Sequence, residues 1–226
     1  LPDGSLIRLT IAHYYSPVGR SFQKPYVKGD RKSYDNDMME RLNSGELMSA
    51  DSIHFPDSLK YTTKGGRIVY GGGGIMPDVY VPLDTTIYTR LYRELAAKSC
   101  IIQATLRYLE KYRKQLIKKY NIEAYRKAKA KKIENKQYDP ADMIEGFGRY
   151  KDGFEVPQEL IDLTLERAKE AKIQYTDSML QATMPVLRIQ LKALLARDLW
   201  DMNEYFQIVN PSLEIYRQGL KAIKEE

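Results

Sequence analysis

Two stretches with the pattern of β-strands decide how the first third of this chain folds: LPDGSLIRLTIAHYYSPVGRSFQ at Leu1–Gln23 and RIVYGGGGIMPDVYVP at Arg67–Pro82. In the first stretch, apolar and polar residues alternate from Ile7 to Ile11, which is the period of a half-buried strand. The SPVG sequence at 16–19 then predicts a turn, because proline fixes φ at one corner and glycine accepts a positive φ. The chain should therefore reverse or leave the sheet after this strand.

A polar insertion separates the two stretches. Residues 24–66 are rich in Asp, Ser, Lys and Gly and are too numerous for an ordinary connection in a compact domain. We expect the insertion to have structure of its own, with one or two helical turns at Met38–Leu42 and a small hairpin whose arms are Ile53–Phe55 and Leu59–Tyr61. Two further strands are predicted after it: Arg67–Tyr70 and Val79–Val81.

The chain changes character near Leu83, after which Ala, Leu, Lys, Glu, Arg and Tyr dominate and glycine and proline become scattered. This composition predicts an all-helical second half, which starts with one long amphipathic helix from a cap at Asp84–Thr86 to about Tyr120. Its apolar residues at helical spacing are Ile87, Leu91, Leu95, Ile102, Leu106, Leu109 and Leu116, and its flanking tyrosines are Tyr88, Tyr92, Tyr108 and Tyr112. The tyrosines are expected to pack at the edge of this face.

Later helices follow from proline positions and from apolar spacing. The expected features are a break at Asp139-Pro140, Gly146 and Gly148, a helix with Pro157 in its first turn, a helix from near Asp177 that is bent or interrupted at Pro185 and continues toward Trp200, and a short last helix from Asn210-Pro211. The predicted fold class is therefore α+β, with a strand-rich part at 1–83 and a helical domain at 84–226.

Composition limits the function classes. The chain has 226 residues, 43% of them apolar, which suits one sizeable domain or two small ones. It contains no run of about 18 apolar residues, so no transmembrane segment is predicted. Cys100 is the only cysteine, which excludes an internal disulfide and a cysteine-cluster metal site, and its apolar neighbours predict a buried helical residue. Any signal peptide is expected to belong to polypeptide upstream of Leu1.

No residue of the chain has a recognisable catalytic context. His13 and His54 are the only histidines, and neither accompanies a Gly-x-Ser-x-Gly sequence. A Ser-Lys dyad needs a lysine buried enough to be neutral, and no pattern buries such a pair together. The glycine run Gly71–Gly74 leads into Pro77 and a strand, whereas a phosphate loop leads into a helix. We therefore assign no catalytic, cofactor-binding or metal-binding residue, and we predict no cofactor.

The stretch from Arg107 to Lys136 is strongly basic, with twelve Lys or Arg residues against three Glu. Such a stretch can bind nucleic acid, anionic lipid or an acidic protein, and it can equally be a solvated helix surface. No nucleic-acid fold signature accompanies it, so nucleic acid is an unlikely partner.

Three blocks in a fixed order carry a resemblance to a known family: LPDGS at Leu1–Ser5, YYSPVGRSFQ at Tyr14–Gln23 and GIMPDVYV at Gly74–Val81. They resemble the last part of the catalytic core of the C-terminal processing (tail-specific) serine peptidases, in the insertion-bearing form of Bacteroidetes-type bacteria. The segment ALLARDLWDMNEYFQIVNPSLEIYRQGLKAI at Ala193–Ile223 also resembles the helical C-terminal extension of this group. Typical members lack an insertion like that at 24–66.

The resemblance implies a serine-type peptidase in which a lysine activates a serine that attacks the peptide carbonyl. In the family both residues precede the part that matches here, as does a PDZ domain that recruits substrate C-termini. This chain is therefore expected to lack the dyad and to be inactive alone, completing the end of a mixed sheet and adding a helical domain for homo-oligomerisation or adaptor binding. Arg20 and Asp78 lie in the matching blocks and are expected to act structurally. The family also implies a periplasmic or cell-envelope location.

Two other function classes remain open. The chain can be a binding or scaffolding protein that keeps the protease-like tail without peptidase activity. A third hypothesis is a basic module for nucleic acid or a membrane surface, centred on Arg107–Lys136.

Overall fold

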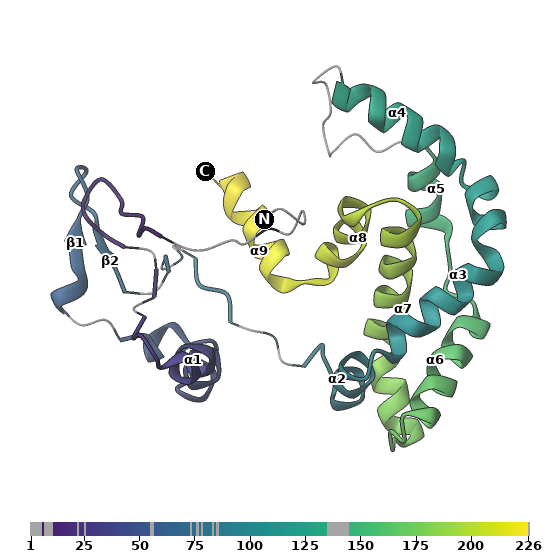
Figure 1. The fold of residues 1–226 in the computed structure, drawn as a ribbon, viewed down its shortest axis with the longest axis horizontal. Helices are drawn as coiled ribbons and strands as arrows, with labels where there is room; N and C mark the ends of the chain where they lie inside the picture. The colour runs from purple at the N-terminus through teal and green to yellow at the C-terminus, as the bar shows by residue number, and fades with distance from the viewer. Residues whose placement is uncertain are drawn as a thin grey trace. The chain divides into compact units, whose positions relative to one another are not determined.

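A computed structural model describes residues 6, 11–21, 23–24, 26–54, 57–72, 74–75, 77, 79–82, 84, 86–134 and 145–225. The chain divides into two compact units, Leu1–Leu83 and Asp84–Glu226. The described part is mostly helical and contains one small sheet of two strands (Figure 1). Each unit is described by itself.

The first unit contains one helix and one β-hairpin. Its elements are α1 (Arg31–Asn43), the 3-10 turns η1 (Ala50–Ser52) and η2 (Asp57–Leu59), and the strands β1 (Lys60–Thr62) and β2 (Ile68–Tyr70). Asp30 caps α1 by accepting a hydrogen bond from the backbone N–H of Ser33. The strands are antiparallel, with Lys60 opposite Tyr70, and the turn between them is closed by the hydrogen bond from Thr63 N to the carbonyl of Arg67.

The insertion differs from its predicted structure in two ways. The helix predicted at Met38–Leu42 is there but begins seven residues earlier, because the Asp30 cap starts it at Arg31. The hairpin predicted between Ile53–Phe55 and Leu59–Tyr61 is wrong. Its second arm pairs instead with Ile68–Tyr70 across the Thr63–Arg67 turn, because this run of β-branched and aromatic residues favours a strand.

The other predicted strands of this unit have different outcomes. The strand predicted at Arg67–Tyr70 is confirmed as β2. Val79–Val81 is not a strand, and Ile11 is irregular, while residues 7–10 of the first predicted strand lie outside the described residues. The predicted turn at 16–19 is present, with Gly19 at a φ of 82° and its N–H bonded to the Ser16 carbonyl.

The second unit is built from helices alone in its described residues. They are α2 (Arg90–Ala97), α3 (Cys100–Lys119), α4 (Ile122–Glu134), α5 (Glu145–Gly153), α6 (Gln158–Glu170), α7 (Asp177–Leu199), α8 (Met202–Val209), the 3-10 turn η3 (Asn210–Ser212) and α9 (Glu214–Glu225). Helix α3 packs along α6 and α7, and α7 also contacts α2 and α8 (Figure 1). The hydrophobic core of this unit is therefore helical and forms around α3, α6 and α7.

The long helix predicted from Asp84 to Tyr120 is two helices. The chain breaks at Lys98 and Ser99, where Ser99 has a φ of 58°, and the cap of α2 is Thr89 rather than the predicted Asp84–Thr86. The break changes which side of α3 is buried. Ile102 and Leu106 are exposed, and the buried residues of α3 are Cys100, Ile101, Ala104, Thr105, Tyr108, Leu109 and Leu116.

The glycines predicted to mark a break lie inside α5. Gly146 is where the first turn of α5 passes against the end of α3, so that a Cβ at this position would clash with the backbone carbonyl oxygen of Tyr120. Close backbone approach, not chain irregularity, accounts for this glycine. The predicted break at Asp139-Pro140 lies outside the described residues.

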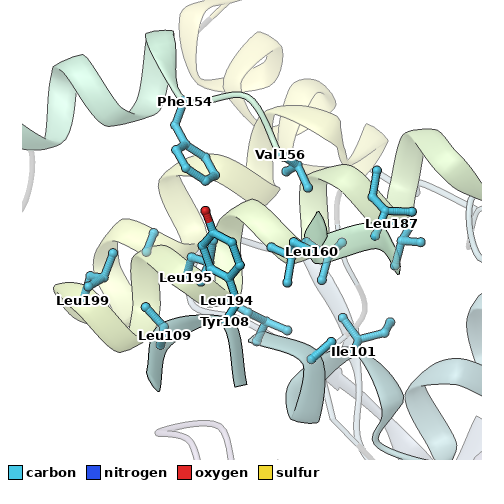
Figure 2. Close-up of a cluster of buried hydrophobic side chains, with 14 of the residues drawn as sticks. Ile101, Tyr108, Leu109, Phe154, Val156, Leu160, Leu187, Leu194, Leu195 and Leu199 are labelled. Atoms are coloured by element: carbon cyan, nitrogen blue, oxygen red, sulfur yellow. The ribbon is translucent and has the colours of Figure 1, made fainter. Parts of the chain in front are cut away.

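The remaining predicted helices are present, with differences at the prolines. Pro157 lies directly before α6 and not in its first turn, α7 runs uninterrupted from Asp177 to Leu199 with Pro185 inside it, and Asn210-Pro211 opens η3, after which α9 starts at Glu214. Leucines of α7 fill the centre of the core with residues of α3 and α6, as Figure 2 shows for Leu187, Leu194, Leu195 and Leu199 beside Leu109 and Leu160. An aromatic cluster continues this core: Tyr120, Tyr125, Phe147, Tyr150, Phe154 and Trp200.

Candidate functional site

The two histidines do not join a catalytic group. His13 is exposed, with its ring 6.5 Å from that of Tyr15, and His54 is exposed, with Nδ1 3.0 Å from the carbonyl oxygen of Ser52. No cluster of three or more His, Cys, Asp or Glu side chains that could hold a metal occurs among the described residues. The described part of the chain thus offers neither a histidine-based triad nor a metal centre.

Cys100 is a core residue, as predicted. It is fully buried in the first turn of α3, and burial raises the pKa of its thiol. A thiol with a raised pKa is a poor nucleophile because little thiolate is present near neutral pH. Burial and the raised pKa thus indicate a packing role for Cys100.

The glycine run allows two segments to approach closely. Gly71 is buried beside the ring of Tyr61 and the side chain of Arg20, and Gly72 has a φ of 91°. No helix follows within the described residues of 71–82, so the run does not form a helix-based phosphate site. The two glycines instead let the backbone pass close to the side chains of Tyr61, Arg20 and Leu59.

Two of the family-like stretches meet at this point. Tyr15 and Ser21 form an isolated antiparallel bridge across the turn at 16–19, and Arg20 Nη1 donates a hydrogen bond of 3.4 Å to the carbonyl of Tyr70 at the end of β2. The stretch before the insertion is thereby joined to the strand after it, and Arg20 has the structural role expected from the sequence. Asp78 lies outside the described residues.

Part of the basic stretch forms ion pairs with α6. Lys111 Nζ lies 2.8 Å from Glu159 Oε1, and the Tyr112 hydroxyl donates to Glu159 Oε2 at 2.7 Å. These two bonds lower the pKa of Glu159. Arg107, one turn before Lys111 on α3, pairs at 3.3 Å with Glu166, which lies about two turns after Glu159 on α6. Tyr112 thus packs at the edge of the core, as predicted, and binds α6.

Helix α4 uses further basic residues to hold the junction of α7 and α8. Arg126 Nη2 donates to the carbonyl of Leu199 at 2.8 Å, and Lys129 Nζ lies 2.9 Å from Asp201 Oδ2. The Lys129 bond lowers the pKa of Asp201. The Tyr125 hydroxyl donates to Glu204, a carboxylate that is only 2% exposed. This network was not predicted, because nothing in the sequence distinguishes Glu204 from the exposed acids around it.

Four basic residues of the stretch are exposed and have no partner within the described part of the chain: Arg113, Lys114, Lys118 and Lys127. The side chains of Lys131, Lys132 and Lys136 are outside the described set. Three of the twelve basic residues, Arg107, Lys111 and Lys129, form ion pairs with acids of the helical unit, so part of the positive charge has a structural role.

Helix α9 has an apolar side that the described residues of the helical unit leave exposed. Ile215, Tyr216, Leu220 and Ile223 are all exposed, Ile223 to 73%, and α9 buries no residue. Its polar side has the ion pairs Glu214–Arg217 and Lys221–Glu225. An exposed apolar stripe of this kind is typical of a surface that binds protein.

The described surface of the helical unit has several hollows. One of about 750 Å³ lies along α6 and the loop after it, and another of about 460 Å³ lies beside Tyr108, Tyr112 and Phe154. A third, of about 550 Å³, lies where the α5–α6 connection meets α7 and α8. The described residues form no helix long and apolar enough to cross a membrane.

Comparison with known proteins gives one match. Residues 136–201 match a family of unknown function (DUF8443). The matched stretch includes α5, α6, α7 and Trp200, so it covers the centre of the helical core and not the strand-rich unit. No curated protein and no solved structure matches the chain.

Proposed function

We propose that this chain is the C-terminal part of a serine endopeptidase of the Ser-Lys type, which processes or degrades proteins from their C-terminal region. Residues 1–83 complete the peptidase core, and residues 84–226 form a helical interaction unit. The intact protein is the enzyme in this proposal, and the chain by itself is inactive. The observation that carries the proposal is the absence of an apolar core from the described residues of the first unit.

The first unit exposes its apolar side chains. Ile11 is 94% and Tyr14 is 76% exposed, and every fully buried apolar side chain in the described residues belongs to the second unit. The other large exposed apolar residues of the first unit are Leu6, Tyr15, Tyr26, Val27, Tyr34, Met38, Met39, Met48, Ile68, Ile75 and Val79. Burying one such side chain stabilises a fold by about 1.5–3 kcal/mol, so a unit that buries none needs covering polypeptide.

The position of the exposed residues supports a peptidase core as the missing cover. Ile11, Tyr14, Ile75 and Val79 lie in or directly beside the blocks that resemble the tail-specific peptidases. The Arg20 bond joins the block at Tyr14–Gln23 across the insertion to Tyr70 of β2, which leads into the block at Gly74–Val81, and the bridge between Tyr15 and Ser21 orders the first of these blocks. A pre-ordered edge of this kind fits a segment that completes a larger sheet.

The proposed chemistry belongs to residues upstream of this chain. There a neutral lysine takes the proton of a serine hydroxyl, the serine attacks the peptide carbonyl to give an acyl-enzyme, and water hydrolyses it. An upstream PDZ domain brings the substrate C-terminus to the site. The periplasmic or cell-envelope location is part of the same proposal and rests on the sequence resemblance alone.

The test begins with the reading frame upstream of Leu1. We expect it to encode a serine at a helix start and, further on, a lysine followed four residues later by glutamine. The purified long product should cleave an unfolded reporter with an apolar C-terminus, its Ser→Ala variant should not, and the 226-residue chain alone should not. A frame without such a pair, or equal cleavage by the Ser→Ala variant, overturns the proposal.

A dye-binding experiment tests the uncovered core directly. The apolar dye ANS should fluoresce strongly with the 226-residue chain and weakly with the long product, because upstream polypeptide then covers the apolar residues of the first unit. If the ANS fluorescence of the 226-residue chain matches that of the long product, the apolar residues of the first unit are not exposed in solution, and the proposal loses its main support.

The helical unit is proposed to bind a second copy or an adaptor through α9. The exposed Ile215, Leu220 and Ile223 support this role. The mass of the assembly can be measured by light scattering after size exclusion. Ile223→Lys should lower this mass or abolish binding of the adaptor. Lys224→Met, a control on the polar side of α9, should change neither the mass nor the binding. An unchanged assembly and cleavage pattern after Ile223→Lys contradicts the role of α9.

A non-catalytic scaffold is the second candidate, favoured by the lack of a catalytic cluster in the described residues together with the exposed face of α9. A basic nucleic-acid or membrane-surface module is the third. Four exposed cations without partners should give only weak retention on heparin, lost at modest salt. Strong retention on heparin at moderate salt that then falls steeply as the salt concentration rises favours the third candidate.

A further inference from the structure

The hollow of about 550 Å³ in the helical unit has the size and lining of a small-molecule site. Its walls come from three places in the fold: the connection after α5, one side of α7 and the α8–η3 corner. Apolar side chains dominate the inner wall, with Phe154 and Val156 from the connection, Ile189 from α7 and Ile208 from α8. Ring contacts in the aromatic cluster hold the connection in place, since Phe154 stacks on Tyr150 with 4.6 Å between centroids.

Lys192 and Lys151 are half-buried cations of this cavity that have no partner in the described residues, and Lys192 is the one that α7 contributes. It lies on α7 directly after Leu191 and is half-buried at the cavity wall. Its ammonium group makes no hydrogen bond and no ion pair within the part of the chain that the structure describes. Burial lowers the pKa of Lys192, while the more distant carboxylates of Asp152 and Glu155 act in the opposite direction. A desolvated ammonium group without a bonded anion is stabilised by a ligand that brings one.

The other charged groups of the cavity limit the charge of that ligand. Arg188 is committed to the protein, because its Nη1 donates to the carbonyl of Val156 at 3.2 Å. Three cations, Lys151, Arg188 and Lys192, line the cavity with two acids, Asp152 and Glu155, which leaves an excess of one positive charge. One negative charge balances this lining, whereas a phosphate dianion would be repelled by the two acids.

We propose that this cavity binds a small monoanion in which a carboxylate is attached to an aliphatic body. The carboxylate accepts a hydrogen bond from Lys192, and the aliphatic part lies against Phe154, Val156, Ile189 and Ile208. A free aliphatic acid and the C-terminal residue of an apolar peptide both present this chemistry. The inference is independent of the proposed peptidase function, because every residue in it belongs to the helical unit.

Titration calorimetry of the 226-residue chain with octanoate tests the proposal. A ligand of this size should bind with a dissociation constant on the order of 0.1–1 mM. Octylamine and octanamide have the same aliphatic body without the negative charge and should bind at least about tenfold more weakly. Acetyl-Leu-Leu-Leu as free acid and as amide distinguishes the sources, since a preference for the free acid peptide over octanoate identifies a peptide C-terminus.

Variants separate the charge from the cavity. Lys192→Met should weaken octanoate binding at least about tenfold, while Lys192→Arg retains it. Lys114→Met removes the same charge from an exposed position of α3 and should leave binding unchanged. Ile208→Trp fills the cavity without changing charge and should abolish binding, with an unchanged circular dichroism spectrum as the check on folding. The proposal is overturned if octanoate and octylamine bind equally, or if Lys192→Met binds octanoate as well as the unchanged chain does. It is also overturned if octanoate does not bind at concentrations up to about 10 mM, roughly tenfold above the expected dissociation constant.

Discussion

We expect Tyr125→Phe to destabilise the helical unit by about 1.5–3 kcal/mol, because the substitution leaves a buried carboxylate without its hydroxyl donor. Glu204 is 2% exposed, so water cannot replace the lost bond at little cost. The nearest cation, Lys129 Nζ, is 4.0 Å from Glu204 Oε2 and is already bonded to Asp201. Phenylalanine keeps the ring contact with Trp200, at 6.4 Å between centroids, so the loss reports the hydroxyl and not the packing.

Urea and thermal unfolding measure this effect, with circular dichroism for the helices and the fluorescence of Trp200 for the junction of α7 and α8. A loss of this size should lower the midpoint temperature by roughly 4–10 °C. Tyr216→Phe is the matched control, because Tyr216 is 38% exposed and has no hydrogen-bond partner in the described residues. It should change the free energy of unfolding by less than about 0.5 kcal/mol.

A double-mutant cycle refines the same prediction. Glu204→Met removes the carboxylate, so adding Tyr125→Phe to it should cost at least about 1 kcal/mol less than Tyr125→Phe alone. The reasoning is refuted if Tyr125→Phe is as mild as the Tyr216→Phe control. It is also refuted if the two changes at Tyr125 and Glu204 add without coupling.

Three further outcomes are expected. Leu195→Ala should lower the free energy of unfolding by about 2–5 kcal/mol in urea titrations, because Leu195 of α7 is fully buried in the hydrophobic core; a loss below about 1 kcal/mol would contradict this packing. Ser99→Gly should be neutral or stabilising by up to about 1 kcal/mol, since φ is 58° there, and clear destabilisation would mean that the helix break is not strained. Stability should fall between pH 10 and about 12, because burial, with Tyr88 nearby, raises the pKa of Tyr92 to about 12, so the unfolded phenol ionises first. Tyr92→Phe should flatten this alkaline loss in urea midpoints measured across that pH range, and an unchanged slope would exclude Tyr92 as a cause.

Local sequence signals were reliable where one residue controls the backbone. Pro157 marks the start of α6, Pro211 lies in η3, and Pro185 lies inside α7. Gly19 has the positive φ that the predicted turn requires. Periodicity was less reliable over long stretches. The pattern from Ile87 to Leu116 is continuous in sequence, yet a single left-handed residue at Ser99 divides it, and Ile102 and Leu106 are exposed as a result.

The polar sites were beyond what the sequence could predict. Glu204 and Lys192 have no motif around them, and each becomes distinctive because helices distant in sequence surround it. The basic stretch at Arg107–Lys136 was recognised from the sequence, but its ion-pair partners were not. Its charge is evident in the sequence, but the acids that neutralise Lys111 and Lys129 come from α6 and from the start of α8.

The sequence by itself determined the change from a glycine-rich, strand-forming part to a helical part, the turn at 16–19, the proline-controlled helix starts and the burial of Cys100. These features depend on backbone preferences and on local apolar spacing, which neighbouring residues set. Only the tertiary structure decided that β1 pairs across the Thr63–Arg67 turn, that Gly146 lies against the end of α3, and which charges are neutralised. Those outcomes depend on which segments meet in space, and contact between distant segments is fixed by packing of the whole unit.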